Sequence, residues 1–362
     1  MQFELKTRQV CLFFIAFMPL SKLFIMPSIM SGYANEDAWL CATLNLLLDF
    51  VTLLFVLRAI RNTKMNVYQL LERTIGKTFA KCVLFLYLIY FTLKNLLPLN
   101  EQKEYVMRTL YTLTPTLLYF LPFFFVALYF CTKNLRVIGR TADVLWLVTA
   151  IGIIILFCLS FSNIELSALL PIGANGALSV LKGSCASLTW FGDAVYLLFF
   201  MGEFKFNKGD GKKIILSFIV SAFAILCFVI VFYTVFQSIA FRQRFALTEI
   251  SKYSTVINNI GRFDYIGIMM VLFSNLFGLS IPLFFSCKIL NYVFSIKKKW
   301  ISPLIITSLH ALIIILFYKR VFSIEQFIMN YTGIFFFIMA NVLPIIICLT
   351  AKKEDKNAIK ES

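Results

Sequence analysis

The sequence predicts an all-α integral membrane protein, and two observations carry this prediction. Hydrophobic residues make up 60% of the 362 positions and charged residues only 14%, whereas soluble domains carry roughly 45–50% apolar and about 25% charged residues. The apolar residues also gather in runs of helix length, not in the roughly ten-residue alternating segments of a barrel. Lipid must therefore be the solvent for much of the apolar surface, and helices are the expected spanning elements.

A spanning helix needs about 20 mostly apolar residues, and about ten such runs follow one another along the chain. They lie near residues 9–30, 37–57, 80–99, 114–131, 142–162, 183–202, 214–239, 265–294, 301–318 and 326–350. The run at 265–294 is long enough to be strongly tilted or to continue into the cytoplasm. We expect residues 1–351 to form a single transmembrane domain and residues 352–362 a charged cytoplasmic tail.

The net charge of +16 does not indicate a nucleic-acid partner, because the basic residues lie in short loops between apolar runs. Lys and Arg in such loops instead hold them on the cytoplasmic side of the bilayer. With the N-terminus inside, the cytoplasmic segments carry 22 Lys and Arg and the outer segments carry 10. We therefore predict a multi-pass protein with both termini in the cytoplasm.

Cysteine and histidine show no pattern typical of metal sites. The nine cysteines are scattered singly without a Cys-x-x-Cys pair, and His310 is the only histidine in the sequence. Zinc sites and disulfide frameworks need clustered residues, so we expect no metal and no cofactor. Metalloprotease, hydrolase, P-loop and dinucleotide-binding motifs are also absent from the sequence, and we predict that the protein is not an enzyme.

The polar segment between the second and third runs contains a short amphipathic pattern. Residues 66–73 are predicted to form a helix on the cytoplasmic face, and Gly76 is expected to end it.

Two of the apolar runs contain residues that interrupt a helix. The first run holds Pro19-Leu20-Ser21-Lys22, where proline removes a backbone donor and clashes with the preceding turn. The sixth holds Trp190-Phe191-Gly192-Asp193, where Gly192 is the weak point. Irregular backbone in a bilayer is tolerated where it lines a cavity or is buried. We therefore predict that both segments line a substrate site. Runs one and six cross the membrane in opposite directions, as two inverted five-helix repeats would require.

Lys22 and Asp193 are expected to lie at the same depth, about 15 Å below the outer ends of their helices at 1.5 Å per residue. A contact between them would relieve the cost of two unpaired charges, each about 2.5–3.5 kcal/mol on translocon scales. The pair is either a structural ion pair or a pair that handles substrate or protons. Asp49, inside the second run, is a further intramembrane carboxylate with the same two alternatives.

Two other polar groups are weaker candidates. Ser274 and Asn275 in the eighth run either line the same cavity or serve ordinary helix packing. Arg140 and Asp143 are three residues apart at the start of the fifth run, so we predict a local structural ion pair between them.

Several segments, in order along the chain, resemble the spore-germination permease family. This family supplies the B-type subunits of nutrient germinant receptors and belongs to the amino acid–polyamine–organocation transporter superfamily. The similar segments are Pro27, Asn35–Leu40, Leu70–Lys77, Leu110–Pro115, Leu135–Arg140 and Ile260–Tyr265. The sequence departs from the family at Pro19–Lys22, where the family usually has a Gly-rich break.

The resemblance implies a five-plus-five inverted-repeat fold with helices 1 and 6 unwound at the centre. It implies binding of a small-molecule nutrient, typically an amino acid, in a bacterial cell membrane or spore inner membrane. It also implies assembly with a larger membrane subunit and a lipoprotein subunit. The alternative is an ordinary proton-coupled amino acid secondary transporter with no role in germination.

Overall fold

The computed structural model describes residues 5–109, 120–160, 164–252, 264–317 and 321–351. Within these residues the fold is helical, apart from one isolated bridge between Leu5 and Phe204. The helices are α1 (Thr7–Phe17), α2 (Met26–Ala34), α3 (Ala38–Asn62), α4 (Val67–Ile75), α5 (Lys77–Thr109), α6 (Leu121–Cys131), α7 (Leu135–Ser160), α8 (Gly176–Ser187), α9 (Ala194–Phe200), α10 (Asp210–Phe236), α11 (Ala246–Lys252), α13 (Asp264–Phe294), α14 (Ile301–Phe317), α15 (Val321–Tyr331), α16 (Gly333–Phe337) and α17 (Leu343–Leu349).

Each predicted apolar run contains helix in its described part, and the runs 9–30 and 183–202 are each interrupted by a short non-helical segment. Five helical segments are long and apolar enough to cross a membrane, and a sixth would be a pair bent by 65° at Thr332. The five are Met26–Asn62, Lys77–Val106, Leu135–Ile155, Asp210–Arg242 and Ile266–Phe294. The tail 352–362 lies outside the described residues. The protein is therefore an all-α, multi-pass membrane protein.

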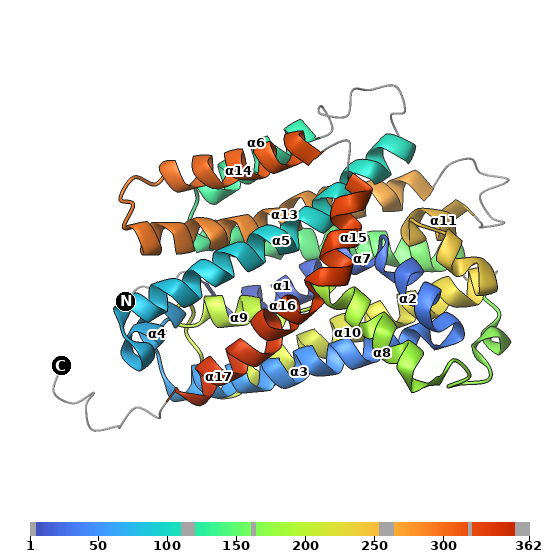
Figure 1. Cartoon of the computed structure of the whole chain (residues 1–362), viewed down its shortest axis with the longest axis horizontal. Helices are drawn as coiled ribbons and strands as arrows, with labels where there is room; N and C mark the ends of the chain where they lie inside the picture. Colours follow the sequence, from blue (N-terminus) through green and yellow to red (C-terminus); the bar gives the residue numbers. More distant parts are fainter. Residues whose placement is uncertain (1–4, 110–119, 161–163, 253–263, 318–320, 352–362) are drawn as a thin grey trace.

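The helices pack around a central pair of interrupted helices (Figure 1). Helices α1 and α9 lie in the middle of the molecule, whereas α2 and α8 lie toward the end that carries α11. Helices α5 and α13 contact each other on one side, and α3 and α10 contact each other on the opposite side. Helices α6 and α14 pack outside α13. The break segments themselves are buried, for example Leu188–Asp193, which keeps their open backbone away from lipid.

Aromatic side chains fill the interior beside α9. The rings of Phe91, Tyr196 and Phe285 lie with their centroids 5.7–5.9 Å apart and nearly parallel. Phe199 contacts Phe91 edge-on at 5.1 Å. Such pairs stabilise a core beyond the area that they bury, so α5, α9 and α13 are held in one packed unit.

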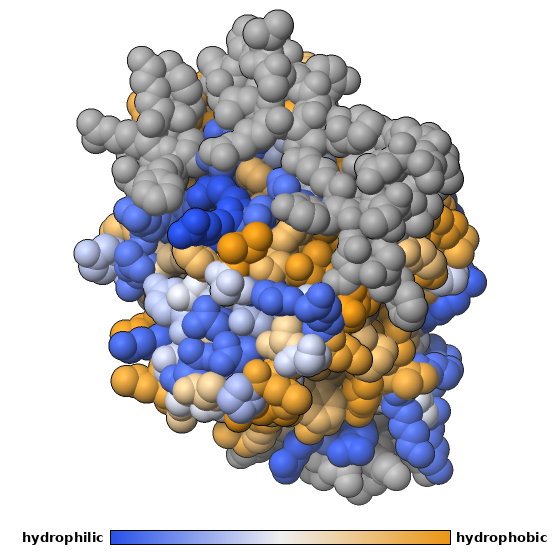
Figure 2. Space-filling model, turned by 90° about the vertical axis from the view of Figure 1, so that its right-hand side faces the viewer, coloured by the Kyte–Doolittle hydropathy of each residue, from blue (hydrophilic) through white to orange (hydrophobic). Residues whose placement is uncertain are grey.

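The surface is divided as the bilayer requires. Large apolar side chains are exposed on the outer faces of the helices, for example Phe125 on α6 and Phe223 on α10. Figure 2 views the molecule from the end that carries α2 and α11, and hydrophilic residues gather over much of the described surface there. The apolar flanks suit lipid, and the polar end suits the interface with water.

The predicted amphipathic helix at residues 66–73 is confirmed as α4. The side chain of Asn66 caps it by accepting a hydrogen bond from the backbone N–H of Gln69 at 2.9 Å. Gly76, with φ of 80°, ends it. The apolar face of α4, which includes Leu70 and Leu71, is buried, so α4 lies against the bundle.

The predicted ion pair between Arg140 and Asp143 is wrong. The Asp143 carboxylate accepts hydrogen bonds from the Arg8 guanidinium and from Gln9 Nε2, both at 2.8 Å. Gly139 allows the close approach of α1 to α7 that brings these donors in, because a Cβ there would lie 2.6 Å from Gln9 Oε1. Asp143 therefore joins two helices instead of pairing along its own.

Candidate functional site

Both predicted interruptions are present, and each exposes a backbone carbonyl to a lysine. Helix α1 ends at Phe17, and after a short turn at Leu20–Lys22 the helix resumes as α2. The carbonyl of Met18, next to Pro19, accepts a hydrogen bond from Lys22 Nζ at 2.8 Å. Between α8 and α9, Gly192 has φ of 89°. The carbonyl of Phe191 accepts a hydrogen bond from Lys94 Nζ.

Four ionisable side chains meet at these two breaks, and all four are buried. Lys22 Nζ forms an ion pair with Asp193 Oδ2. The two residues that were predicted to lie at the same depth in the membrane are therefore in contact. Lys94 Nζ on α5 lies 3.6 Å from Asp193 Oδ1. Asp49 on α3 interacts electrostatically with Asp193 and both lysines. Two positive and two negative groups therefore share one buried cluster.

Asp49 holds the start of α9. Its carboxylate accepts hydrogen bonds from the N–H of Gly192 at 2.9 and 3.0 Å and from the N–H of Asp193 at 3.2 Å. A carboxylate at a helix N-terminus satisfies unpaired N–H groups and complements the helix dipole. One turn earlier on α3, Asn45 donates to the Ser184 carbonyl at 3.0 Å. One face of α3 thus positions the whole interruption between α8 and α9.

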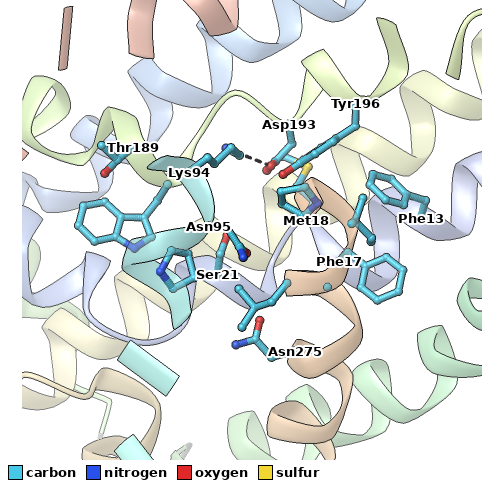
Figure 3. Close-up of a pocket in the computed structure, with 16 residues that line it drawn as sticks. Phe13, Phe17, Met18, Ser21, Lys94, Asn95, Thr189, Asp193, Tyr196 and Asn275 are labelled. Atoms are coloured by element: carbon cyan, nitrogen blue, oxygen red, sulfur yellow. Dashed lines mark ion pairs between the residues drawn. The ribbon is translucent and has the colours of Figure 1, made fainter. Parts of the chain in front are cut away.

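A cavity of about 50 Å³ lies beside this cluster. Its lining combines aromatic and aliphatic side chains with a few polar ones (Figure 3). The polar lining residues are Ser21, Lys94, Asn95, Thr189, Asp193 and Asn275. This combination of an apolar wall with few convergent polar groups is typical of a small-molecule site.

The predicted site residues divide into two groups. Ser21, Trp190, Asp193 and Asn275 line the cavity. The others, which lie outside its lining, are Pro19, Leu20, Lys22, Phe191, Gly192 and Ser274. Lys22 acts on the site indirectly, because it forms an ion pair with the lining residue Asp193. Gly192 acts through its backbone conformation, which interrupts the helix beside the cavity.

Among the lining residues that were not predicted are two polar ones on α5, Lys94 and Asn95. Asn95 is fully buried, and both its amide oxygen and its amide nitrogen lack a hydrogen-bond partner among the described residues. Figure 3 shows its amide beside Ser21 at the centre of the cavity. The signal that could have found them is the one used for Lys22: a charged and an amide residue inside the apolar run 80–99.

A second polar cluster lies between the cavity and α11. Trp190 Nε1 donates a hydrogen bond to Glu101 Oε1 at 2.7 Å, and Glu101 is buried. Beyond it, the Arg244 guanidinium lies 3.2 Å from Glu104 of α5 and 2.5 Å from Glu325 of α15. Burial alone would lower the pKa of Arg244, but the carboxylates of Glu325 and Glu104 raise it above its usual value. Arg244 is therefore a permanent cation that joins three segments.

Helix α11 is attached to the first interruption by its backbone. The N–H of Ala246 donates to the carbonyl of Phe24 at 2.9 Å, and the N–H of Leu247 donates to that of Leu23 at 3.1 Å. These carbonyls belong to the segment between α1 and α2, where the regular hydrogen bonds of a helix are interrupted. The start of α11 thus covers one side of the interruption.

Within the described residues, no group of three or more His, Cys, Asp and Glu side chains is placed to hold a metal ion.

Comparison with known proteins places the chain in a family. Residues 4–325 match the spore permease family, described as spore germination protein. No curated protein matches the chain. Among solved structures, the chain is similar to a manganese transporter of Eremococcus coleocola in complex with an aromatic bis-isothiourea substituted compound, with a TM-score of 0.61 and 11% identity over 98% of this chain and 82% of that one.

Two single-residue variants of the same transporter give comparable values. Their TM-scores are 0.59 and 0.57, each at 12% identity, over 95% and 99% of this chain and 78% and 82% of theirs. At such identity the similarity establishes only that the chain shares the fold of this transporter. With most of its length matched by the family, this chain is a member of the spore germination permease family.

Proposed function

We propose that the cavity binds a compact zwitterion, an amino-acid-like nutrient, and that the protein senses or moves it across the membrane. The observation that carries this proposal is Asn95, a fully buried amide that lines the cavity and has no hydrogen-bond partner among the described residues. A buried polar group left unpaired costs free energy, so a ligand or water that pairs with it is favoured. Thr189 Oγ1 is also buried without a hydrogen-bond partner in the described part of the chain, and it offers a second such group.

The charges that line the cavity suit a zwitterion. Asp193 is placed to accept hydrogen bonds from a ligand ammonium group, and Lys94 and Asn95 Nδ2 to donate to a ligand carboxylate. Lys94 Nζ and Asp193 Oδ1 lie 3.6 Å apart, so a ligand with adjacent opposite charges would lie alongside them and pair with both. The solved relatives are described as manganese transporters, but a lysine ammonium in the lining disfavours a divalent cation.

The size of the cavity favours a small ligand. A volume of about 50 Å³ exceeds the roughly 10–15 Å³ that one water needs. It leaves space for a few water-sized groups rather than for a large aromatic side chain. We therefore expect glycine- or alanine-sized amino acids to bind better than phenylalanine or tryptophan.

We further propose ten spans arranged as two inverted five-helix repeats. In that arrangement α3 in the first repeat corresponds to α10 in the second, and α5 corresponds to α13. The two helices of each pair contact each other. The second such pair also shares an internal proline, Pro98 in α5 and Pro282 in α13, and both prolines line the cavity. Two broken helices crossing at a midplane site are typical of this arrangement.

Family membership supports a receptor role. We propose that the protein acts with a larger membrane subunit and a lipoprotein subunit of a germinant receptor, in a bacterial cell membrane or spore inner membrane. The second candidate function is an ordinary proton-coupled amino acid transporter. The buried carboxyl groups of Asp49, Asp193 and Glu101 support it, because intramembrane carboxylates recur in proton relays.

Calorimetric titration of the full-length purified protein with a panel of amino acids tests the proposal. We expect at least one small amino acid to bind, and Asn95→Leu to weaken its binding by about tenfold or more, since a partner hydrogen bond is lost. Ser280→Ala is the control, because Ser280 is buried on α13 but bonds to its own helix at the Leu276 carbonyl. Equal binding by wild type and Asn95→Leu would refute the site.

Uptake of the same amino acid into proteoliposomes with an imposed proton gradient separates the two functions. Uptake that follows the gradient favours the transporter. Binding without uptake favours the receptor subunit.

A further inference from the structure

A groove of about 580 Å³ lies far from the cavity, between the end of α3 and the start of α10. Four basic side chains line it: Arg58 and Arg61 from α3, and Lys208 and Lys212 from the segment that enters α10 and its first turn. All four are exposed. The groove therefore gathers side chains of one charge from two parts of the chain that are about 150 residues apart in sequence.

The positive charge of the groove is not neutralised within the described residues. None of the ion pairs found there includes any of the four basic residues. The nearest acid along the chain, Asp210, is buried and directed elsewhere. It accepts hydrogen bonds from Thr7 Oγ1 at 2.8 Å, from the N–H of Asn207 at 3.0 Å and from Lys213 Nζ at 3.2 Å. The start of α10, a helix of 27 residues, adds the positive end of its dipole.

One side of the groove is apolar. Leu54 and Leu57 lie one turn before Arg58 and Arg61 on α3 and share their face. On α10, Ile215 follows Lys212 by one turn and also lines the groove. Both helices belong to candidate spans, Met26–Asn62 and Asp210–Arg242. The basic residues therefore mark the membrane end of each helix, and the apolar residues continue toward the bilayer interior.

We propose that this groove binds the headgroup of an anionic phospholipid, with the phosphate among the four basic side chains and an acyl chain along Leu54, Leu57 and Ile215. Basic pockets between transmembrane helices at the membrane surface suit such headgroups. A free phosphate would use the charges but leave the apolar wall exposed to water. The lipid satisfies both halves of the groove, which is why we favour it. The site is independent of the ligand in the central cavity.

Native mass spectrometry of the full-length protein, with phosphatidylglycerol or phosphatidylcholine added in mixed micelles, tests the proposal. We expect phosphatidylglycerol adducts to persist where phosphatidylcholine adducts do not. The double variant Arg61→Gln/Lys212→Gln should weaken phosphatidylglycerol binding roughly tenfold or more, since each basic residue near a membrane surface contributes several-fold. The charge-preserving variant Arg61→Lys/Lys212→Arg should bind as wild type does.

The matched control is Lys297→Gln/Lys298→Gln. These lysines are exposed and lie between α13 and α14, at the same end of the molecule (Figure 1). Retention of lipid by this control, beside loss in the groove variant, supports the site. Equal loss of phosphatidylglycerol binding in both double variants would show that binding depends only on the net charge of the protein, and it would overturn the proposal. Equal binding of phosphatidylcholine, or displacement of phosphatidylglycerol by millimolar inorganic phosphate, would also overturn it.

Discussion

The side chains that decide the chemistry of the central site are two lysines and two carboxylates. Lys22, Lys94, Asp49 and Asp193 come from four different parts of the chain and are all buried. With every group ionised, their charges cancel. A buried charge that loses its partner is far more costly than a balanced pair, so the four residues are expected to respond to substitution as one unit.

This charge balance predicts an energetic coupling between Lys22 and Asp193. Asp193→Asn leaves two lysines with one carboxylate, and Lys22→Met leaves one lysine with two. Each single variant should lose about 3–5 kcal/mol of stability. The double variant keeps Lys94 with Asp49 and should recover part of the loss. Thermal unfolding of the four proteins gives the double-mutant cycle. Losses that simply add, without recovery in the double variant, would show that the pair does not interact.

The same variants separate structural from ligand-binding roles. Recovery of stability without recovery of amino acid binding would mean that the charges contact the ligand. Recovery of both would make the pair purely structural, since neither charge would then be needed for binding.

At the scale of single elements, the start of α9 depends on the conformation of Gly192. Its φ of 89° is one that L side chains rarely adopt, and a Cβ there would lie 2.6 Å from Ala340 Cβ and 2.7 Å from the Tyr90 hydroxyl. Gly192→Ala should therefore combine backbone strain of about 1–3 kcal/mol with a steric clash. We expect a lower melting temperature and loss of the Asp49 cap.

Gly209→Ala is the matched control for this prediction. Gly209 also has positive φ, 98°, but a Cβ there would meet nothing within 4 Å. It therefore carries the strain without the clash. If the two variants melt at the same temperature, the close packing around Gly192 does not contribute.

The loop before α11 depends on Arg244. Arg244→Gln removes the ion pairs of Arg244 with Glu104 and Glu325. The cost should be roughly 1–3 kcal/mol, below the usual 3–5 kcal/mol for a buried pair, because the Arg244 side chain is 27% exposed. Hydrogen exchange should accelerate at the amides of Ala246 and Leu247. Arg242→Gln, an exposed neighbour, should leave exchange unchanged, and equal acceleration in both variants would contradict the role of Arg244.

At the scale of the whole molecule, local sequence patterns predicted much of the fold. Run length placed the helices, as in 265–294 against α13 at Asp264–Phe294, and proline and glycine located both interruptions. The bend in the last run, at Thr332 before α16, was not predicted, although Gly333 follows it directly.

Contacts between distant segments were harder to predict. The Asp143 carboxylate accepts hydrogen bonds from Arg8 and Gln9 of another helix, although Arg140 lies three residues away on its own helix. Lys94 and Asn95 were missed because the side of α5 that faces the cavity depends on how α5 packs against α13. Sequence periodicity identifies a buried face but not the element that covers it, so the central site could be located by its breaks and only partly by its lining.

The two ends of the molecule differ in charge, which predicts its orientation across the membrane. Helix α4, the end of α17 and the connection from α13 to α14 lie at one end of the molecule, whereas the segment before α8 lies at the other (Figure 1). Basic residues concentrate at the first end, among them Arg61, Lys208 and Lys298, so the positive-inside rule places that end in the cytoplasm. In cells whose exposed native cysteines have been replaced, a membrane-impermeant maleimide should label Ala174→Cys from outside. It should label Lys298→Cys only after permeabilisation. Both positions are exposed in the structure, so a missing signal reflects sidedness and not burial. Labelling of Lys298→Cys in intact cells, with Ala174→Cys protected, would reverse the orientation and place both termini outside.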